Sequence, residues 1–110
     1  HAPAQNNLGF MYRNGKGVPQ NDVEAVKWYR LAAEQGVPRA QSNLGLMYAR
    51  GVGVIQNNVY AYMWWNIAAS LGDEDAKGNR DIVADRMTRE DIAKAQALAV
   101  ECVAKNYKGC

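Results

Sequence analysis

The sequence is poor in the side chains that carry out chemistry. Its only histidine is His1, and its hydroxyl nucleophile candidates are Ser42, Ser70 and Thr88. A serine or cysteine hydrolase needs a nucleophile beside a histidine base, and no such set is present. A metal site needs a cluster of ligands, which one histidine and two cysteines do not provide. The sequence therefore predicts a protein that is not an enzyme and that has no metal site and no cofactor.

Positive and negative charges are nearly balanced, so neither sign dominates. The formal net charge is +2, and lysines do not cluster with aromatic residues as they do in single-strand-binding proteins. We therefore expect no nucleic-acid partner.

No charged residue occurs between Gly51 and Gly72. Polar residues such as Gln56 and Asn66 interrupt this stretch, and its strongly apolar part is too short to span a membrane. A helix that is apolar most of the way round is normally buried. Two interpretations are open: the C-terminal helices cover the helix expected at 58–71, or that helix is an exposed patch that binds a partner.

What the sequence does contain is an internal repeat. A shift of 36 residues lays Ala4–Arg39 over Ala40–Asp75, and 18 of the 36 positions are identical. A fixed period of this size predicts a stacked solenoid, in which each unit buries its apolar face against its neighbours. The identical residues of the second unit are Ala40, Gln41, Asn43, Leu44, Gly45, Met47, Tyr48, Gly51, Gly53, Val54, Gln56, Asn57, Val59, Ala61, Trp64, Ala68, Ala69 and Gly72.

Each unit has the pattern of two helices joined by a glycine-containing turn. Ala40, Leu44 and Met47 lie at i, i+4 and i+7, which places them on one face of the first helix. Glycine inside a helix costs about 1 kcal/mol relative to alanine. Its recurrence at Gly9 and Gly45 therefore indicates a partner helix packed too closely to admit a Cβ. The facing stripe of the second helix consists of Ala61, Trp64, Ala68 and Leu71.

The motif A-x-x-x-L-G-x-x-Y-x-x-G-x-G-V, followed by A-x-x-W, A-A and a final G, resembles the Sel1-like repeat. Two units match it over residues 4–75. The resemblance implies an all-α fold, a right-handed α-solenoid of the tetratricopeptide-like type with a longer loop between its two helices. It also implies a scaffold for protein–protein contacts.

We expect a single domain, residues 1–110, made of three parts. Residues 1–36 and 37–72 are Sel1-like repeats, and residues 73–110 are a degenerate repeat and C-terminal cap. In the third part Arg80 and Asp81 replace the Leu-Gly pair of the repeat. Terminal repeats are expected to be atypical because one side faces solvent. The packing stripe of the last helix consists of Ile92, Ala95, Ala99, Cys102 and Val103.

The beginning of the chain resembles the start of the second unit. His1-Ala2-Pro3 takes the place of Val37-Pro38-Arg39. We therefore expect the chain to be the C-terminal part of a longer protein.

The resemblance to tetratricopeptide-like repeats implies a concave groove lined by the first helix of each unit. Phe10 and Leu46 are the most informative positions, because they are apolar yet lie off the main apolar stripe of the first helix. They either face a protein or peptide partner or take part in ordinary core or neighbour packing. The expected groove positions are Asn6, Phe10, Arg13, Asn14, Ser42, Leu46, Ala49 and Arg50.

Two other functions are alternatives to a binding scaffold. The chain can be a structural spacer within a longer solenoid. Some cysteine-rich relatives have been linked to β-lactam binding or hydrolysis, but these repeats lack the regular cysteine pairs of that subgroup.

The two cysteines, Cys102 and Cys110, suit a disulfide that closes the C-terminus. In an unbroken helix eight residues would separate their Cα atoms by roughly 12 Å, whereas a disulfide tolerates no more than about 7 Å. The chain must therefore turn back after about Asn106, and Gly109 gives it that freedom. The alternative is one buried thiol and one exposed thiol. Because disulfides persist in oxidising compartments, we expect a periplasmic or secreted protein of bacterial type, with the cytoplasm as the alternative.

Overall fold

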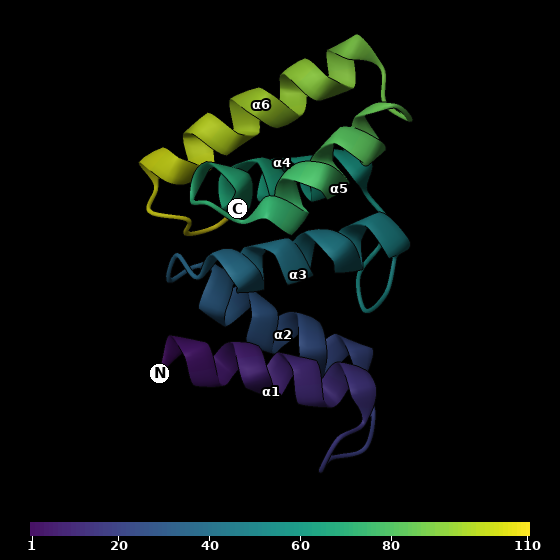
Figure 1. The fold of residues 1–110 in the computed structure, drawn as a ribbon, viewed down its shortest axis with the longest axis vertical. Helices are drawn as coiled ribbons and strands as arrows, with labels where there is room; N and C mark the ends of the chain where they lie inside the picture. The colour runs from purple at the N-terminus through teal and green to yellow at the C-terminus, as the bar shows by residue number, and fades with distance from the viewer.

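The computed structural model describes residues 1–110, which form six α-helices and no strand. The helices stack in chain order along the long axis of a molecule that measures 42 × 26 × 23 Å (Figure 1). α1 pairs with α2 and α3 with α4, while α2 packs against α3 of the next unit. The predicted all-α repeat fold is therefore confirmed. The helices are α1 (Ala2–Asn14), α2 (Asp22–Ala33), α3 (Pro38–Arg50), α4 (Asn58–Ser70), α5 (Glu74–Ala84) and α6 (Arg89–Ala104).

The helix ends recur with the period of the sequence. Gly15 and Gly51 end α1 and α3 in the left-handed conformation, with φ of 67° and 66°. Asn21 and Asn57 begin α2 and α4, where each side-chain oxygen accepts a hydrogen bond from the backbone N–H three residues on. These capping residues stop each helix at the same place, which keeps the two units in register.

The two glycines inside the first helices each meet an aromatic ring. A Cβ at Gly9 would lie 2.6 Å from the ring of Tyr29, and one at Gly45 would lie 2.8 Å from Nε1 of Trp65. Both rings belong to the second helix of the same unit. The close approach predicted for these glycines is confirmed. The ring of Trp65 is also fixed by its Nε1, which donates a hydrogen bond to the carbonyl oxygen of Ser42 at 3.0 Å.

The uncharged helix α4 is covered by the C-terminal part of the chain. Its side chains Met63, Trp64 and Ile67 are at most 2% exposed. They belong to one core cluster with Ala99 and Cys102 of α6. Of the two interpretations of this helix, burial under the cap is therefore the one observed.

Two expected core residues lie at the surface instead. Leu71 is 43% exposed, because α4 ends one residue earlier and Leu71 serves as its C-cap. Val103 is 48% exposed. The buried line of α6 runs through Ala95, Ala99 and Cys102, and the following residue is turned about 100° away from it.

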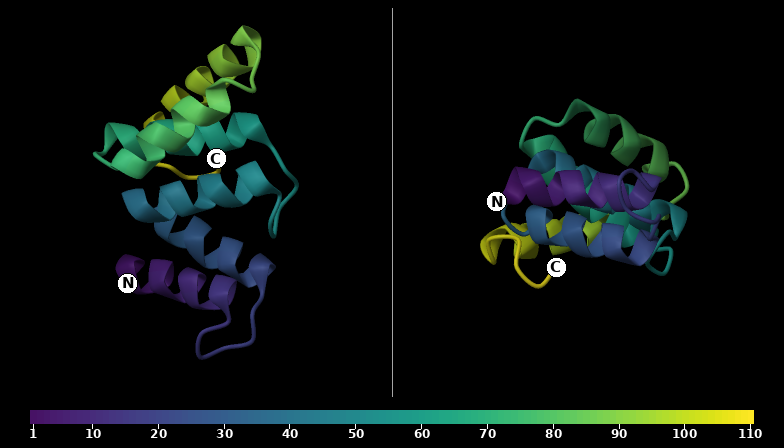
Figure 2. Two further views of the ribbon diagram at one scale, coloured as in Figure 1. Left: turned by 45° about the vertical axis from the view of Figure 1, so that its right-hand side comes forward. Right: turned by 90° about the horizontal axis from the view of Figure 1, so that it is seen from below.

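The third part of the chain is built differently from the two units before it. Helix α5 takes the place of a first helix beside α4, but α6 packs chiefly on α4 and not on α5. In Figure 2 α6 crosses the end of the stack obliquely. The cap therefore closes the core of the second unit without forming a third regular helix pair. None of the six helices combines the length and the hydrophobicity that crossing a membrane requires.

The end of the chain folds back on itself. Cys102 and Cys110 form a disulfide with their Cα atoms 5.6 Å apart. Helix α6 ends at Ala104, and Asn106 and Tyr107 then adopt positive φ of 54° and 65°. This is the turn that the cysteine spacing predicts.

The returning segment reaches the boundary between the two repeats. The ring of Tyr107 packs against the main core and lies against Gly36, where a Cβ would come within 3.2 Å of it. Gly36 lies three residues beyond the end of α2 and has φ of 82°. The C-terminal segment therefore contacts both the cap and the first repeat.

Removing a central aromatic residue should destabilise the stack strongly. Trp64 is fully buried, so Trp64→Ala is expected to cost about 3–5 kcal/mol. Its counterpart Trp28 is only partly buried, so Trp28→Ala should cost less. Urea melts of both variants measure this. A Trp64→Ala variant within about 1 kcal/mol of the parent would contradict the assigned core.

Removing the disulfide should loosen the C-terminal segment. On the chain-entropy model, Cys102→Ala with Cys110→Ala is expected to lose about 2–3 kcal/mol of stability. The measurement is a urea melt of the double variant beside the parent. Mass analysis of parent protein alkylated without reduction is the control, and two alkylated cysteines in that sample would mean that the bridge does not form.

Candidate functional site

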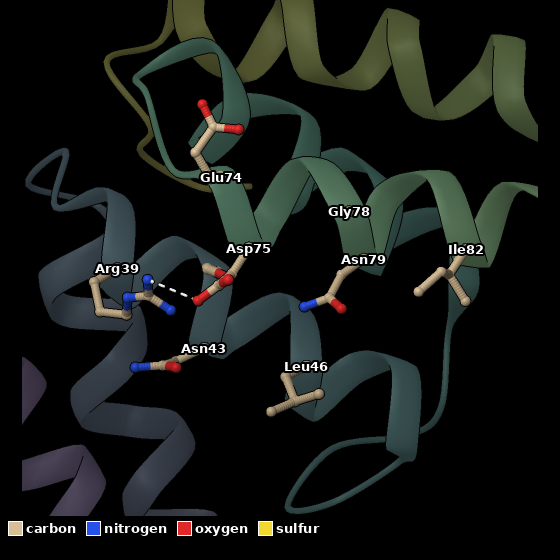
Figure 3. A pocket seen from close by; sticks show the side chains of 9 residues that line it. Arg39, Asn43, Leu46, Glu74, Asp75, Gly78, Asn79 and Ile82 are labelled. Atoms are coloured by element: carbon tan, nitrogen blue, oxygen red, sulfur yellow. Dashed lines mark hydrogen bonds and ion pairs between the residues drawn. The ribbon is translucent and has the colours of Figure 1, made fainter.

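A hollow lies between helices α3 and α5 (Figure 3). It has a volume of about 320 Å³ and opens to solvent. We call it the α3–α5 groove. Its lining residues are Arg39, Ser42, Asn43, Leu46, Glu74, Asp75, Gly78, Asn79 and Ile82.

The groove is built from the same repeat positions on both helices. Shifting α3 by 36 residues places Ser42 on Gly78, Asn43 on Asn79 and Leu46 on Ile82. In α1 the positions that precede these by another 36 are Asn6, Asn7 and Phe10. The first helices of the stack therefore present one polar row and one apolar row, each running from unit to unit.

Charged side chains close one end of the groove. Arg39 Nη2 lies 3.2 Å from Asp75 Oδ2 and 3.4 Å from Asp73 Oδ2, and so it joins α3 to the beginning of α5. Asp73 is nearly buried and also caps α5, because its Oδ1 accepts a hydrogen bond from the N–H of Ala76 at 2.9 Å. This end of the groove is therefore held by an ion-paired arginine and a capped helix.

Carboxamides occupy the middle of the groove. Asn43 Nδ2 donates a hydrogen bond to Asn6 Oδ1 at 3.1 Å, which links α3 to α1. The Asn79 carboxamide extends from α5 toward the groove in Figure 3, and this side chain has no hydrogen-bond partner within the chain. Each carboxamide has a donor and an acceptor, and both asparagines keep at least one of these groups free.

The residues expected in the groove from sequence occupy several different places. Leu46 lines it, and Ser42 lies at its base with only 4% of its surface exposed. Asn6 reaches it through Asn43. Phe10 lies at the equivalent position one unit earlier and is 46% exposed.

The other expected positions lie toward the helix pairs or the helix ends. Arg13 is near Tyr29, a tyrosine whose pKa is raised by burial, a rise that the charge of Arg13 opposes. Ala49 packs against the second core cluster. Asn14 donates a hydrogen bond to the carbonyl of Phe10 within α1, while Arg50 is exposed at the end of α3.

The α5 side of the groove was missing from the expected set. This side includes Gly78, Asn79 and Ile82. Extending the 36-residue period into residues 73–110 would have predicted these positions. Arg80 and Asp81 replace the Leu-Gly pair that marks the register of the repeat. Without that pair the sequence does not indicate which residues of α5 take the groove positions.

The groove offers contacts for recognition. It combines carboxamide groups, two aliphatic side chains and one arginine shared between carboxylates. No three His, Cys, Asp or Glu side chains are grouped so as to hold a metal ion.

Stacked helix pairs with a groove along their first helices define an α-solenoid of short helical repeats. A profile of the Sel1 repeat matches residues 2–37 and 38–73. The chain belongs to the Sel1 repeat family.

Two solved structures are similar to this chain. One is c5321, described as a protective antigen of uropathogenic Escherichia coli with an SLR fold, which is 31% identical with a TM-score of 0.91. The other is a Sel1 repeat protein from Oxalobacter formigenes, 41% identical with a TM-score of 0.72. The matches cover 97% and 73% of this chain but only 24% and 33% of those chains. No curated protein matches the chain.

Proposed function

We propose that the chain is a protein–protein interaction scaffold that binds a protein or peptide through the concave face of its first helices. This face carries the apolar row of Phe10, Leu46 and Ile82, and it is centred on the α3–α5 groove. Membership of the Sel1 repeat family supports a scaffold. The two described relatives are longer than this chain, so the proposal concerns this part of the solenoid alone.

The observation that carries the proposal is the exposure of the apolar row. Phe10 is 46% and Ile82 is 61% exposed, and both share the repeat position of Leu46. Core packing therefore does not explain why this position is apolar in the first and third parts of the chain. Apolar side chains that recur along one exposed face are typical of a surface that a partner covers.

A structural spacer is the other candidate for this part of the chain. A spacer needs only the contacts between neighbouring units, so it gives no reason for an exposed apolar row. The exposed row favours the binding scaffold.

The disulfide supports an oxidising compartment. Cys102 and Cys110 are bonded, and such bonds are rare in the cytosol. We infer that the protein is periplasmic or secreted and of bacterial type.

The binding face can be tested by removing its apolar side chains. Phe10→Ser with Ile82→Ser should abolish capture of partners, because the two residues are the exposed ends of the row. The expected change in stability is small, about 1 kcal/mol or less. Leu46 is left unchanged because it also packs against the second core cluster.

The matched control is Ile55→Ser with Val100→Ser, which removes two exposed apolar side chains elsewhere, 90% and 72% exposed. Parent, double variant and control are immobilised and exposed to extracts of the source cells, and the captured proteins are identified by mass spectrometry. Proteins held by parent and control but lost from the double variant are the expected result. The same proteins on all three would exclude this face as the binding surface.

A further inference from the structure

Gly78 lies inside helix α5 without any internal reason to be glycine. Glycine in a helix interior costs about 1 kcal/mol relative to alanine. At Gly9 and Gly45 an aromatic ring occupies the space that a Cβ would need. At Gly78 no atom lies within 4 Å of an added Cβ, and the residue has no positive φ. Neither packing nor backbone conformation therefore accounts for this glycine.

The place of Gly78 in the groove suggests what the missing side chain makes room for. The equivalent positions hold Asn6 and Ser42, so a side chain is compatible with the repeat. Figure 3 shows Gly78 on the wall of the groove, between Asp75 at one end and Ile82 at the other. Glycine is the residue that lets another main chain approach most closely.

We propose that the α3–α5 groove binds an extended peptide segment whose main chain passes over Gly78. This rests on the proposed function and specifies its ligand. An α-helix is about 10–12 Å wide and satisfies its own backbone groups. An extended chain is thinner and needs partners for its N–H and C=O groups, which the free carboxamide groups of Asn43 and Asn79 supply.

The ends of the groove determine which side chains the peptide carries. Asp73 and Asp75 share the single positive charge of Arg39, so this end keeps a net negative charge and is complementary to a lysine or arginine. Leu46 and Ile82 at the other end suit an aliphatic side chain. From residue 75 to residue 82 the helix rises about 10 Å, which equals about three residues of extended chain. The peptide therefore carries a basic residue about three positions from an aliphatic one.

The probe is a phage library of random linear peptides, selected on the whole chain of 110 residues. The strongest peptide is synthesised with a fluorescein label and titrated by fluorescence anisotropy. We expect it to show the basic and aliphatic pair, and replacing its basic residue with glutamate should weaken binding about tenfold or more.

The decisive variant is Gly78→Trp, which fills the groove from a position where the fold has open space. It should weaken binding about tenfold or more while melting at or above the parent temperature. Gly78→Ala should melt higher and still bind, because it adds only a methyl group. Val100→Trp on α6 is the matched control for an added indole, and it should bind like the parent. Gly78→Leu replaces the tryptophan variant if that variant fails to fold.

Three results would overturn the proposal. They are a selection that yields no binding linear peptide, a bound peptide that is helical by circular dichroism, and unchanged affinity in a folded Gly78→Trp or Gly78→Leu variant. The variant with Phe10→Ser and Ile82→Ser separates this failure from that of the proposed function. If that variant alone loses binding, the concave face binds peptides but not across Gly78. If neither variant loses binding, the concave face is not the binding surface.

Discussion

The contact of an aromatic ring with a helix glycine is the constraint on which the rest of the structure depends. Tyr29 covers Gly9 and Trp65 covers Gly45, and each pair fixes the spacing of the two helices in a unit. With the two helices this close, the alanines of the second helix become contact points for the next first helix, as Ala32, Ala33 and Ala40 show in the core. On the first helices of the stack Phe10 and Ile82 remain exposed, and they belong to the proposed binding face.

At the end of the stack the amino-acid composition of the second helix changes, while the geometry of the helix pair stays the same. Helix α4 begins at an asparagine N-cap as α2 does, but the positions of Lys27 and Leu31 become the buried residues Met63 and Ile67. These side chains provide the surface on which α6 lies. The repeat therefore ends by burying positions that are exposed or half-buried in the first unit, with an apolar residue in place of Lys27.

The sequence predicted the features that depend on local chemistry or on the period. The close approach at Gly9 and Gly45, the burial of Trp64 and the return of the chain to Cys110 all follow from residue type and spacing. The α3 side of the groove could be predicted from the sequence because it lies in a unit that carries the full repeat motif. The α5 side was not marked, and the oblique path of α6 depends on how its small residues fit α4, for which no local signal exists. Val103 was misplaced for the same reason.

The contact of Tyr107 with Gly36 has a consequence for how the chain folds. In a simple repeat array each unit touches only its neighbours, so units can unfold separately from an end. Here the last residues pack on the same core as α2, α3, α4 and α6, and so the chain's end is joined to the boundary of its first unit. Such a contact between distant parts of the sequence forms late and slows folding. It also means that fraying at the C-terminus exposes the interior of both repeats, so this part of the solenoid unfolds as one cooperative body.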